Sequence, residues 1–265
     1  MITLKDIHVT FAKGTPLETK ALRGVNLKIK DGEFITVIGS NGSGKSTLLN
    51  LLSGEIQAIS GNIYIDDVDV TQKTTSQRAG LISRVFQDPL AGSCENLSIE
   101  ENMALAWGRG RSRSLSQAIR KNRKILFSKH LSRLGLGLEK RLEDKMGLLS
   151  GGQRQAVSLL MATLQPAKIL LLDEHTAALD PKTADFVLKL SCEIIQENKL
   201  TSLMVTHSMQ QALDVGTRTI MLHEGNIIFD IEGDERSRLE IPDLLELFKQ
   251  TQKGKELTDD SLLLG

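Results

Sequence analysis

Two segments of this sequence hold side chains that could bind a phosphate chain and a divalent cation. Residues 39–46 match the pattern G-x-x-x-x-G-K-[ST], with Lys45 and Ser46 at its end. Glycines in such a loop let backbone N–H groups turn toward phosphate oxygens, Lys45 adds a positive charge, and the Ser46 hydroxyl can ligate Mg²⁺. Residues 169–174 are an apolar run that ends in two carboxylates, Asp173 and Glu174. These residue types and spacings predict a site for a nucleotide and Mg²⁺.

The residues expected to contact the nucleotide run from this loop into the helix that should follow it. An incidental Gly/Ser-rich turn is the alternative interpretation. A buried strand before the loop and a helix after it favour a phosphate site, because the helix adds its positive N-terminal end. The expected contacts are Gly39, Ser40, Asn41, Gly42, Ser43, Gly44, Lys45, Ser46 and Thr47.

The two carboxylates after the apolar run are suited to metal binding and proton transfer. At the end of a strand in a doubly wound sheet they would lie where such folds bind their ligands. Asp173 would hold Mg²⁺ through water, and Glu174 would act as general base on the attacking water, a role worth about 10²–10⁴ in rate. Acidic residues also end strands merely as helix caps, so the pair needs the other motifs to identify the site.

A second glycine-rich loop, residues 149–153, lies between these two segments in the chain. Its sequence is Leu-Ser-Gly-Gly-Gln, and a helix N-terminus there would present Ser150 and glycine N–H groups to a γ-phosphate. A plain N-cap serine followed by small residues is the alternative. The order of phosphate loop, second loop and acidic strand resembles the ABC-type ATPases, and the resemblance covers residues 1 to about 232.

The resemblance implies a site shared by two copies of the chain that pair head to tail, because in this family the second loop closes on ATP held by another subunit. It also implies that Gln87 contacts Mg²⁺ and the attacking water, and that His207 is the switch histidine near the γ-phosphate. The implied roles are catalysis for Glu174, His207 and Gln87, metal binding for Ser46, Gln87 and Asp173, and contacts across the subunit boundary for Ser150, Gly151, Gly152, Gln153 and Asp180.

Two further positions can be compared with the family pattern. Phe11 stands where the family usually has an aromatic residue that stacks on adenine, a contact worth about 1–3 kcal/mol, and a phenylalanine in the strand core is the alternative. His175 follows the acidic pair where many relatives have proline. We expect a neutral surface histidine there and give it no catalytic role.

The elements that must position these residues follow from hydrophobic period and capping signals. Residues 33–38 predict a buried strand that leads into the phosphate loop. A helix should follow over residues 45–53, with Gly54 as its C-cap. Ser98, in a capping box, and Asp180, before a proline, are the predicted N-caps of two further helices.

Buried strands that alternate with helices indicate an α/β fold with a mostly parallel sheet. The resemblance makes this a RecA-like P-loop core, residues 1–87 and 165–232, with an N-terminal antiparallel β-subdomain and an inserted helical subdomain at about residues 88–164. Together these parts would form one ABC ATPase domain over residues 1–232. Residues 233–265 would form a C-terminal helix and a flexible tail.

Composition narrows the class of protein further. Lys and Arg total 33 and Asp and Glu total 33, so the chain has no overall bias toward polyanions. No run approaches the ~18 apolar residues that cross a bilayer, and the N-terminus lacks a signal-peptide pattern. Cys94 and Cys192 are expected to be free thiols in a reducing compartment. We expect a cytoplasmic protein that is peripheral on the inner face of the cell membrane.

A basic stretch, residues 109–133, holds nine basic residues and no acidic ones. A solvated helix face is the usual explanation for such a run. Docking against a membrane partner or anionic lipid headgroups is a second explanation, and nucleic-acid binding is a third.

The resemblance implies an ATP-binding, ATP-hydrolysing subunit that powers a bacterial ABC transporter, with ATP and Mg²⁺ as its cofactors. The motifs are most similar to those of solute importers of the amino-acid type, with tryptophan or tyrosine as the candidate solute. The implied partners are a second ATPase subunit in a homodimer, an integral membrane permease and, for an importer, a solute-binding protein. No direct contact with the solute and no nucleic-acid partner are expected. The alternatives are an exporter or lipid/lipoprotein-release ABC ATPase, and a soluble ABC ATPase that acts on nucleic acid.

Overall fold

The computed structural model describes residues 1–111 and 121–251. The chain divides into two compact units, which we name by their place in the sequence. The terminal unit contains residues 1–75 and the described part of residues 200–265, and the middle unit contains residues 76–199. The phosphate loop and His207 therefore belong to the terminal unit, whereas the second glycine-rich loop and the two carboxylates belong to the middle unit.

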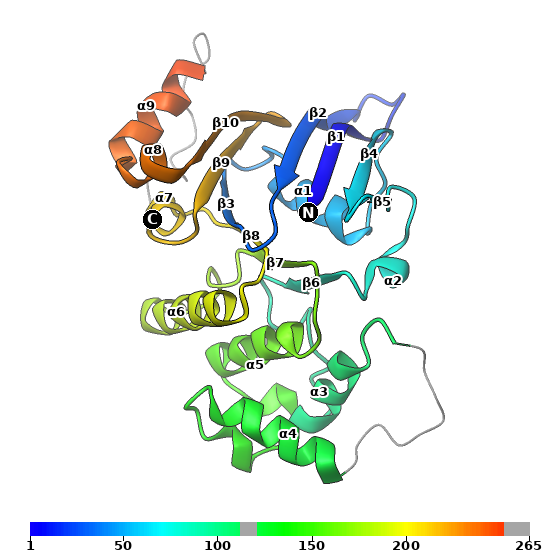
Figure 1. Cartoon of the computed structure of the whole chain (residues 1–265), viewed down its shortest axis with the longest axis vertical. Coiled ribbons are helices and arrows are strands. Elements are labelled where there is room, and N and C mark those ends of the chain that lie inside the picture. Colours follow the sequence, from blue (N-terminus) through cyan, green and yellow to red (C-terminus); the bar gives the residue numbers. More distant parts are fainter. Residues whose placement is uncertain (112–120, 252–265) are drawn as a thin grey trace. The chain divides into compact units, whose positions relative to one another are not determined.

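An antiparallel sheet in the terminal unit is built from the first strands of the chain. Alternate residues of the first strand are buried, as a sheet with one covered face requires, and an irregularity between Leu4 and Ile7 resets the alternation so that Ile7 and Val9 are also buried. The strands are β1 (Ile2–Phe11), β2 (Thr19–Ile29), β4 (Ser60–Ile65) and β5 (Val68–Asp69), in the order β2-β1-β4-β5 (Figure 1).

The strand that leads into the phosphate loop belongs to a set of mostly parallel strands in the same unit. All five residues of the central strand, β3, are buried, as is typical of a parallel strand whose sheet is covered on both faces. The strands are β3 (Phe34–Ile38), β8 (Ser202–Val205), β9 (Arg218–His223) and β10 (Asn226–Glu232); β8 and β9 run parallel to β3, and β10 runs antiparallel to β9. Helix α1 (Lys45–Ser53) follows the loop and ends at the C-cap Gly54, as predicted.

The C-terminal helices cover the end of β3 that leads into the loop. On α9, Leu244 and Phe248 are buried in one cluster with Ile38 and Met221. The predicted C-terminal helix is present as α9, and the tail beyond residue 251 lies outside the described residues. The helices of this part are α7 (Met209–Asp214), α8 (Gly233–Ser237) and α9 (Ile241–Thr251).

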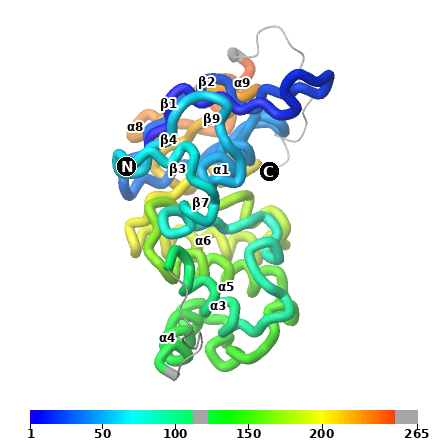
Figure 2. The backbone as a smooth tube through the Cα atoms, turned by 90° about the vertical axis from the view of Figure 1, so that its right-hand side faces the viewer, coloured from blue at the N-terminus to red at the C-terminus, as the bar shows by residue number. Residues whose placement is uncertain are grey.

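The middle unit combines a parallel strand pair with helices. Strands β6 (Ile82–Val85) and β7 (Ile169–Asp173) pair in parallel, and Figure 2 shows the helical part of the unit, with α3 and α5 side by side. Its helices are α2 (Thr75–Arg78, which begins at the unit boundary), α3 (Ile99–Trp107), α4 (Lys121–Ser132), α5 (Gly151–Thr163) and α6 (Pro181–Asn198), with short 3₁₀ turns η1 (Leu138–Lys140) and η2 (Met146–Leu148).

Two predicted helix starts are present in the middle unit. The Ser98 side chain accepts from the Glu101 backbone N–H at 3.2 Å, and Glu101 accepts from the Ser98 backbone N–H at 2.7 Å, which completes a capping box at α3. Asp180 caps α6 by accepting from the Thr183 backbone N–H at 3.2 Å. Local sequence signals thus decide where these helices begin.

Among residues 1–111 and 121–251, no helix has both the length and the apolar character of a membrane span.

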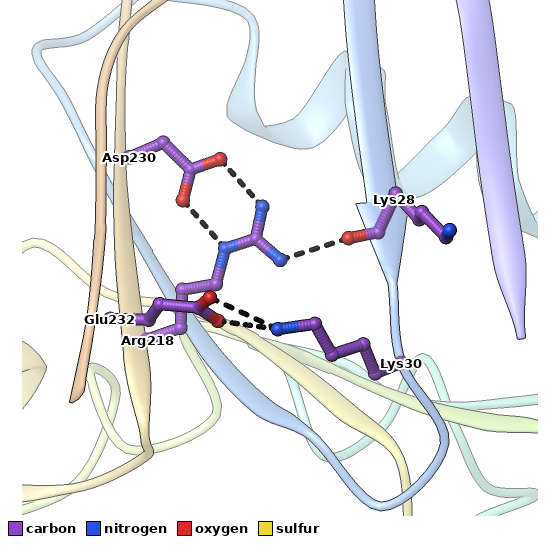
Figure 3. Close-up of a pocket in the computed structure, with 5 residues that line it drawn as sticks. All are labelled: Lys28, Lys30, Arg218, Asp230 and Glu232. Atoms are coloured by element: carbon purple, nitrogen blue, oxygen red, sulfur yellow. Dashed lines mark hydrogen bonds and ion pairs between the residues drawn. The ribbon is translucent and has the colours of Figure 1, made fainter.

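A charged pocket of about 320 Å³ lies on the terminal unit, where β2 approaches β9 and β10 (Figure 3). Arg218 donates to both carboxylate oxygens of Asp230 at 2.6 and 2.5 Å and to the Lys28 carbonyl oxygen at 2.8 Å, and Lys30 pairs with Glu232 at 2.9 Å. The hydrogen bonds to Asp230 raise the pKa of the Arg218 guanidinium above its already high value. These paired charges join the two sheets, so we assign the pocket a structural role.

Candidate functional site

The phosphate loop leaves β3 through backbone conformations that favour glycine. Gly39, Gly42 and Gly44 have φ angles of 148°, 75° and 109°. A Cβ at Gly39 would lie 2.1 Å from the Leu222 carbonyl oxygen, and one at Gly44 would lie 2.7 Å from the Ala21 carbonyl oxygen. Side chains at these two positions would therefore push the loop away from the strands that hold it.

Lys45 folds back over the loop that precedes it. Its Nζ donates to the carbonyl oxygens of Gly39 at 2.6 Å and Ser40 at 3.1 Å, and the residue is only 5% exposed. The contacts hold a positive charge against the loop, where phosphate oxygens can take the place of the carbonyl groups as acceptors.

The helix after the loop begins without a side-chain cap. Gly44 is the N-cap of α1 and offers no side-chain acceptor, and no acidic residue lies in the first turn. The first N–H groups of α1 therefore favour an anion from outside the helix. Ser43 adds a buried hydroxyl that lacks a hydrogen-bond partner, and Ser46 is exposed on the first turn. These observations fit a phosphate chain with its metal ion.

Strand β7 carries the two predicted carboxylates at its end. Asp173 is its last residue, and the side chain is 14% exposed. Glu174 follows with a φ of 45° and is buried. This left-handed conformation costs a non-glycine residue about 1–3 kcal/mol and is found preferentially at functional sites. The end of β7 therefore carries two adjacent carboxylates with little exposure to water, the second of them on a strained backbone.

The second glycine-rich loop forms the N-terminus of α5. The Ser150 hydroxyl accepts from the Gln153 backbone N–H at 3.3 Å, and the Gln153 side chain accepts from the Ser150 backbone N–H at 3.2 Å. The N-cap geometry considered as an alternative is therefore present. It is compatible with ligand binding, because Ser150 is exposed and its hydroxyl proton can still be donated. Gly151 is also exposed, whereas Gly152 is buried against Thr183.

Gln155 connects the segments that carry the predicted catalytic residues of the middle unit. It is fully buried on α5, and its Nε2 donates to the Phe86 carbonyl oxygen at 2.8 Å and to the His175 carbonyl oxygen at 2.7 Å. These carbonyl groups belong to the residue before Gln87 and the residue after Glu174. One amide therefore holds the two segments at a fixed separation. Sequence reasoning missed Gln155. The one feature of the sequence that could have indicated its role is its place as a polar residue at the start of a largely apolar stretch.

The remaining predicted residues lie at element ends. Gln87 is exposed two residues beyond the end of β6, and His207 is half-buried between β8 and α7. Asp180 is exposed at the start of α6, and its hydrogen bonds with Thr183 lower the pKa of its carboxyl group. Phe11 is 43% exposed at the end of β1, which argues against a place in the strand core.

The expectation of a surface position for His175 is wrong. The residue is only 2% exposed, and burial lowers the pKa of the imidazole from 6.5 to about 4. Its Nε2 lies 2.8 Å from Ser191 Oγ on α6. The ring is neutral at physiological pH, as expected, but because α6 covers it, it is a packing residue of the middle unit.

Arg84 is the second residue that sequence reasoning missed. Its guanidinium forms an ion pair of 2.5 Å with Asp173, the carboxylate predicted to bind Mg²⁺. The contact depends on the pairing of β6 with β7, and the sequence pattern of one strand does not reveal which strand it pairs with.

The chain is similar to known proteins in both sequence and fold. The sequence profile of the ABC transporter family matches residues 22–177, more than half of the chain. The chain belongs to the ABC transporter family. It is an ATP-binding subunit and an ABC ATPase, and the family inferred from the motifs is confirmed.

Two curated relatives match this ABC ATPase over most of its length. A tyrosine transport ATP-binding protein of Clostridioides difficile is 42% identical over 250 residues, which are 94% of this chain and 99% of the relative. The energy-coupling factor transporter ATP-binding protein EcfA2 of Clostridium tetani is 35% identical over 236 residues, which are 88% of this chain and 80% of the relative.

Solved structures share the fold of this ABC ATPase. A dimeric post-hydrolysis state of the ATP-binding cassette MJ0796, bound to ADP and Pi, has a TM-score of 0.74 and 31% identity, and covers 88% of this chain and 98% of its own. A nucleotide-free cassette from an ABC transporter has a TM-score of 0.76 and 25% identity, and covers 94% and 98%. The predicted α/β fold, with an antiparallel N-terminal sheet beside mostly parallel strands, is confirmed.

Proposed function

We propose that this ABC ATPase is the energy-coupling subunit of a bacterial amino-acid importer, with tyrosine or a chemically similar amino acid as the solute. The observation that carries the proposal is the likeness to a tyrosine transport ATP-binding protein, which extends over 94% of this chain and 99% of the relative. Likeness over nearly the full length of both chains favours a common partner type as well as a common ATPase motor.

ATP would be bound by two copies of the chain. In each site, Lys45 and Ser46 of one copy would bind the phosphates and Mg²⁺, with Asp173 as the further metal-binding residue, while Ser150 and Gly152 of the second copy would approach the γ-phosphate. Bound Mg²⁺ would neutralise phosphate charge. The uncapped N-terminus of α1 and the exposed Ser150 support this arrangement.

Hydrolysis would depend on protein groups around the attacking water. Glu174 would accept its proton, Gln87 would orient it, and His207 would hydrogen-bond the γ-phosphate. Because Gln155 ties together the segments next to Gln87 and Glu174, both groups would keep a defined separation during the reaction. Phe11 would stack on the adenine ring.

The solute would be selected by other polypeptides. A membrane permease, with a solute-binding protein on its outer side, would contact the solute, and this chain would supply the energy from the inner face of the membrane. The dimeric cassette structure among the relatives supports a homodimeric motor.

The ATPase part of the proposal is tested with the Glu174→Gln variant. We expect ATP turnover to fall at least ~10²-fold while ATP still binds, and light scattering should then show a closed dimer with ATP. Near-normal turnover in this variant would remove Glu174 from its role.

The importer part is tested by reconstituting the chain with its permease and binding protein in vesicles and measuring ATP-dependent uptake of labelled tyrosine. Export of tyrosine, or no uptake of tyrosine or of any chemically similar amino acid, would contradict it.

A further inference from the structure

Arg84 and Asp173 form an ion pair on adjacent strands of the middle unit. Strand β6 pairs with β7 in parallel, and Arg84 lies opposite Leu171. Residues two apart on a strand share a face, so Asp173 lies diagonally across from Arg84 on the same face. Arg84 Nη2 donates to Asp173 Oδ2 at 2.5 Å, and the two side chains are 10% and 14% exposed. The strand register thus places a nearly buried guanidinium on the carboxylate predicted to bind the metal.

Phe86 contacts the same guanidinium. The Arg84 Cζ lies 4.7 Å from the centroid of the Phe86 ring, within the range of a cation–π contact. Phe86 is itself held by Gln155, which donates to its carbonyl oxygen at 2.8 Å. The guanidinium therefore contacts a ring and a carboxylate, both of them anchored in the middle unit.

The charge of Asp173 explains why a cation is needed at this position. A carboxylate with little contact to water is costly unless an opposite charge compensates it, and Arg84 supplies that charge from the protein itself. Mg²⁺ held by the same carboxylate would place a second positive charge near the guanidinium. Like charges repel more strongly where water is excluded, so Arg84 and the metal oppose one another at Asp173.

We infer that Arg84 is a positioning residue that serves as the resident counter-ion of Asp173 and limits the strength with which this carboxylate holds Mg²⁺. Arg84 compensates the negative charge of Asp173 when no metal is present. When Mg²⁺ leaves with the product, the ion pair between Arg84 and Asp173 again compensates this charge. This inference rests on the proposed function, because it requires Asp173 to act on the metal of Mg·ATP.

The test compares the affinity of a fluorescent, non-hydrolysable ATP analogue in EDTA with its affinity in Mg²⁺. Removal of Arg84 takes a positive charge away from metal-free ATP, so the metal-free Kd should rise. The same change removes the repulsion between the guanidinium and Mg²⁺, so the Kd for Mg·ATP should fall. In Arg84→Gln, the ratio of the metal-free Kd to the Mg²⁺ Kd should therefore rise about tenfold or more over the wild-type ratio. Arg84→Met, which retains an apolar stem beside Phe86, should give the same rise, and Arg84→Lys should stay near the wild-type ratio.

Two controls separate this effect from a general loss of charge or of folding. Arg133→Gln removes a guanidinium that forms an exposed ion pair with Glu197 in the same unit, and it should leave the ratio unchanged. In the Asp173→Asn background, Arg84→Gln should change the ratio far less, because the carboxylate that couples the two cations is absent. Thermal unfolding and circular dichroism establish that each variant is folded.

The outcomes distinguish this inference from the proposed function. An unchanged or lower ratio in folded Arg84→Gln and Arg84→Met proteins overturns the inference, and a lower ratio would mean that Arg84 helps Asp173 to hold the metal. If the wild-type chain itself fails to bind Mg·ATP, the proposed function is overturned instead.

Discussion

The Nε2 atom of His175 lies 2.8 Å from Ser191 Oγ, and this contact defines the tautomer of a buried imidazole. The Ser191 hydroxyl donates its one proton to the Val187 carbonyl oxygen at 2.8 Å. Ser191 must therefore accept from the ring, so His175 carries its proton on Nε2. A second proton on Nδ1 would create a buried charge, which is the physical reason that the pKa of this imidazole falls to about 4.

Protonation of His175 should destabilise the fold in acid. The pKa of His175 is about 4 in the folded chain and 6.5 ordinarily. Above pH 6.5 the ring is therefore neutral in both the folded and the unfolded chain, and its titration does not reduce the free energy of unfolding. Between pH 6.5 and 4 the unfolded chain binds the proton, and the free energy of unfolding should fall by about 1.4 kcal/mol per pH unit from this group. His175→Gln keeps an N–H donor and does not titrate. Denaturant unfolding of both proteins at each pH gives a difference curve, and a flat difference curve would contradict the prediction.

Replacement of Gln155 by leucine should weaken the middle unit. The change leaves the Phe86 and His175 carbonyl groups without their common donor, and each buried unsatisfied group costs about 1–3 kcal/mol. We expect the free energy of unfolding to fall by about 2–4 kcal/mol, measured by chemical denaturation. Gln153→Ala, which removes one exposed hydrogen bond from the capping box of the same helix, is the matched control and should cost no more than about 1 kcal/mol. Equal losses in the two variants would show that Gln155 does not bridge the segments.

Local signals predicted much of this fold because the responsible interactions are local. The capping box at Ser98, the N-cap at Asp180 and the C-cap at Gly54 each satisfy backbone groups within a few residues of themselves. The phosphate loop was predictable for the same reason, since its glycines adopt positive φ angles locally and Lys45 donates to carbonyl groups of the same loop.

Interactions between distant elements account for what the sequence did not reveal. Arg84 meets Asp173 only because β6 and β7 pair in one register, and Gln155 reaches two carbonyl groups from different segments. His175 was expected at the surface, yet α6 covers it with Ser191. Pairing and packing of this kind leave no periodic pattern in a single segment.

Gly152 should tolerate alanine only when Thr183 is shortened. A Cβ at Gly152 would lie 2.0 Å from Thr183 Cγ2, where the start of α5 packs against the start of α6. Gly152→Ala should therefore lower the free energy of unfolding by about 1–3 kcal/mol through overpacking. Thr183→Ser removes the clashing methyl group, and the double variant should recover most of the loss in thermal unfolding. Failure of this rescue would place the strain elsewhere.

Phe11 should contribute to nucleotide affinity and little to folding. The ring is 43% exposed at the end of β1, so its removal opens no core cavity, and we expect Phe11→Ala to change the free energy of unfolding by about 0.5 kcal/mol or less. If the ring stacks on adenine, the Kd for ATP should rise by roughly 5- to 150-fold, the equivalent of about 1–3 kcal/mol. Phe11→Trp keeps an aromatic face and should bind ATP nearly as well as the wild type. Calorimetric titration with ATP measures both variants, and an unchanged Kd in Phe11→Ala would show that another residue holds the base.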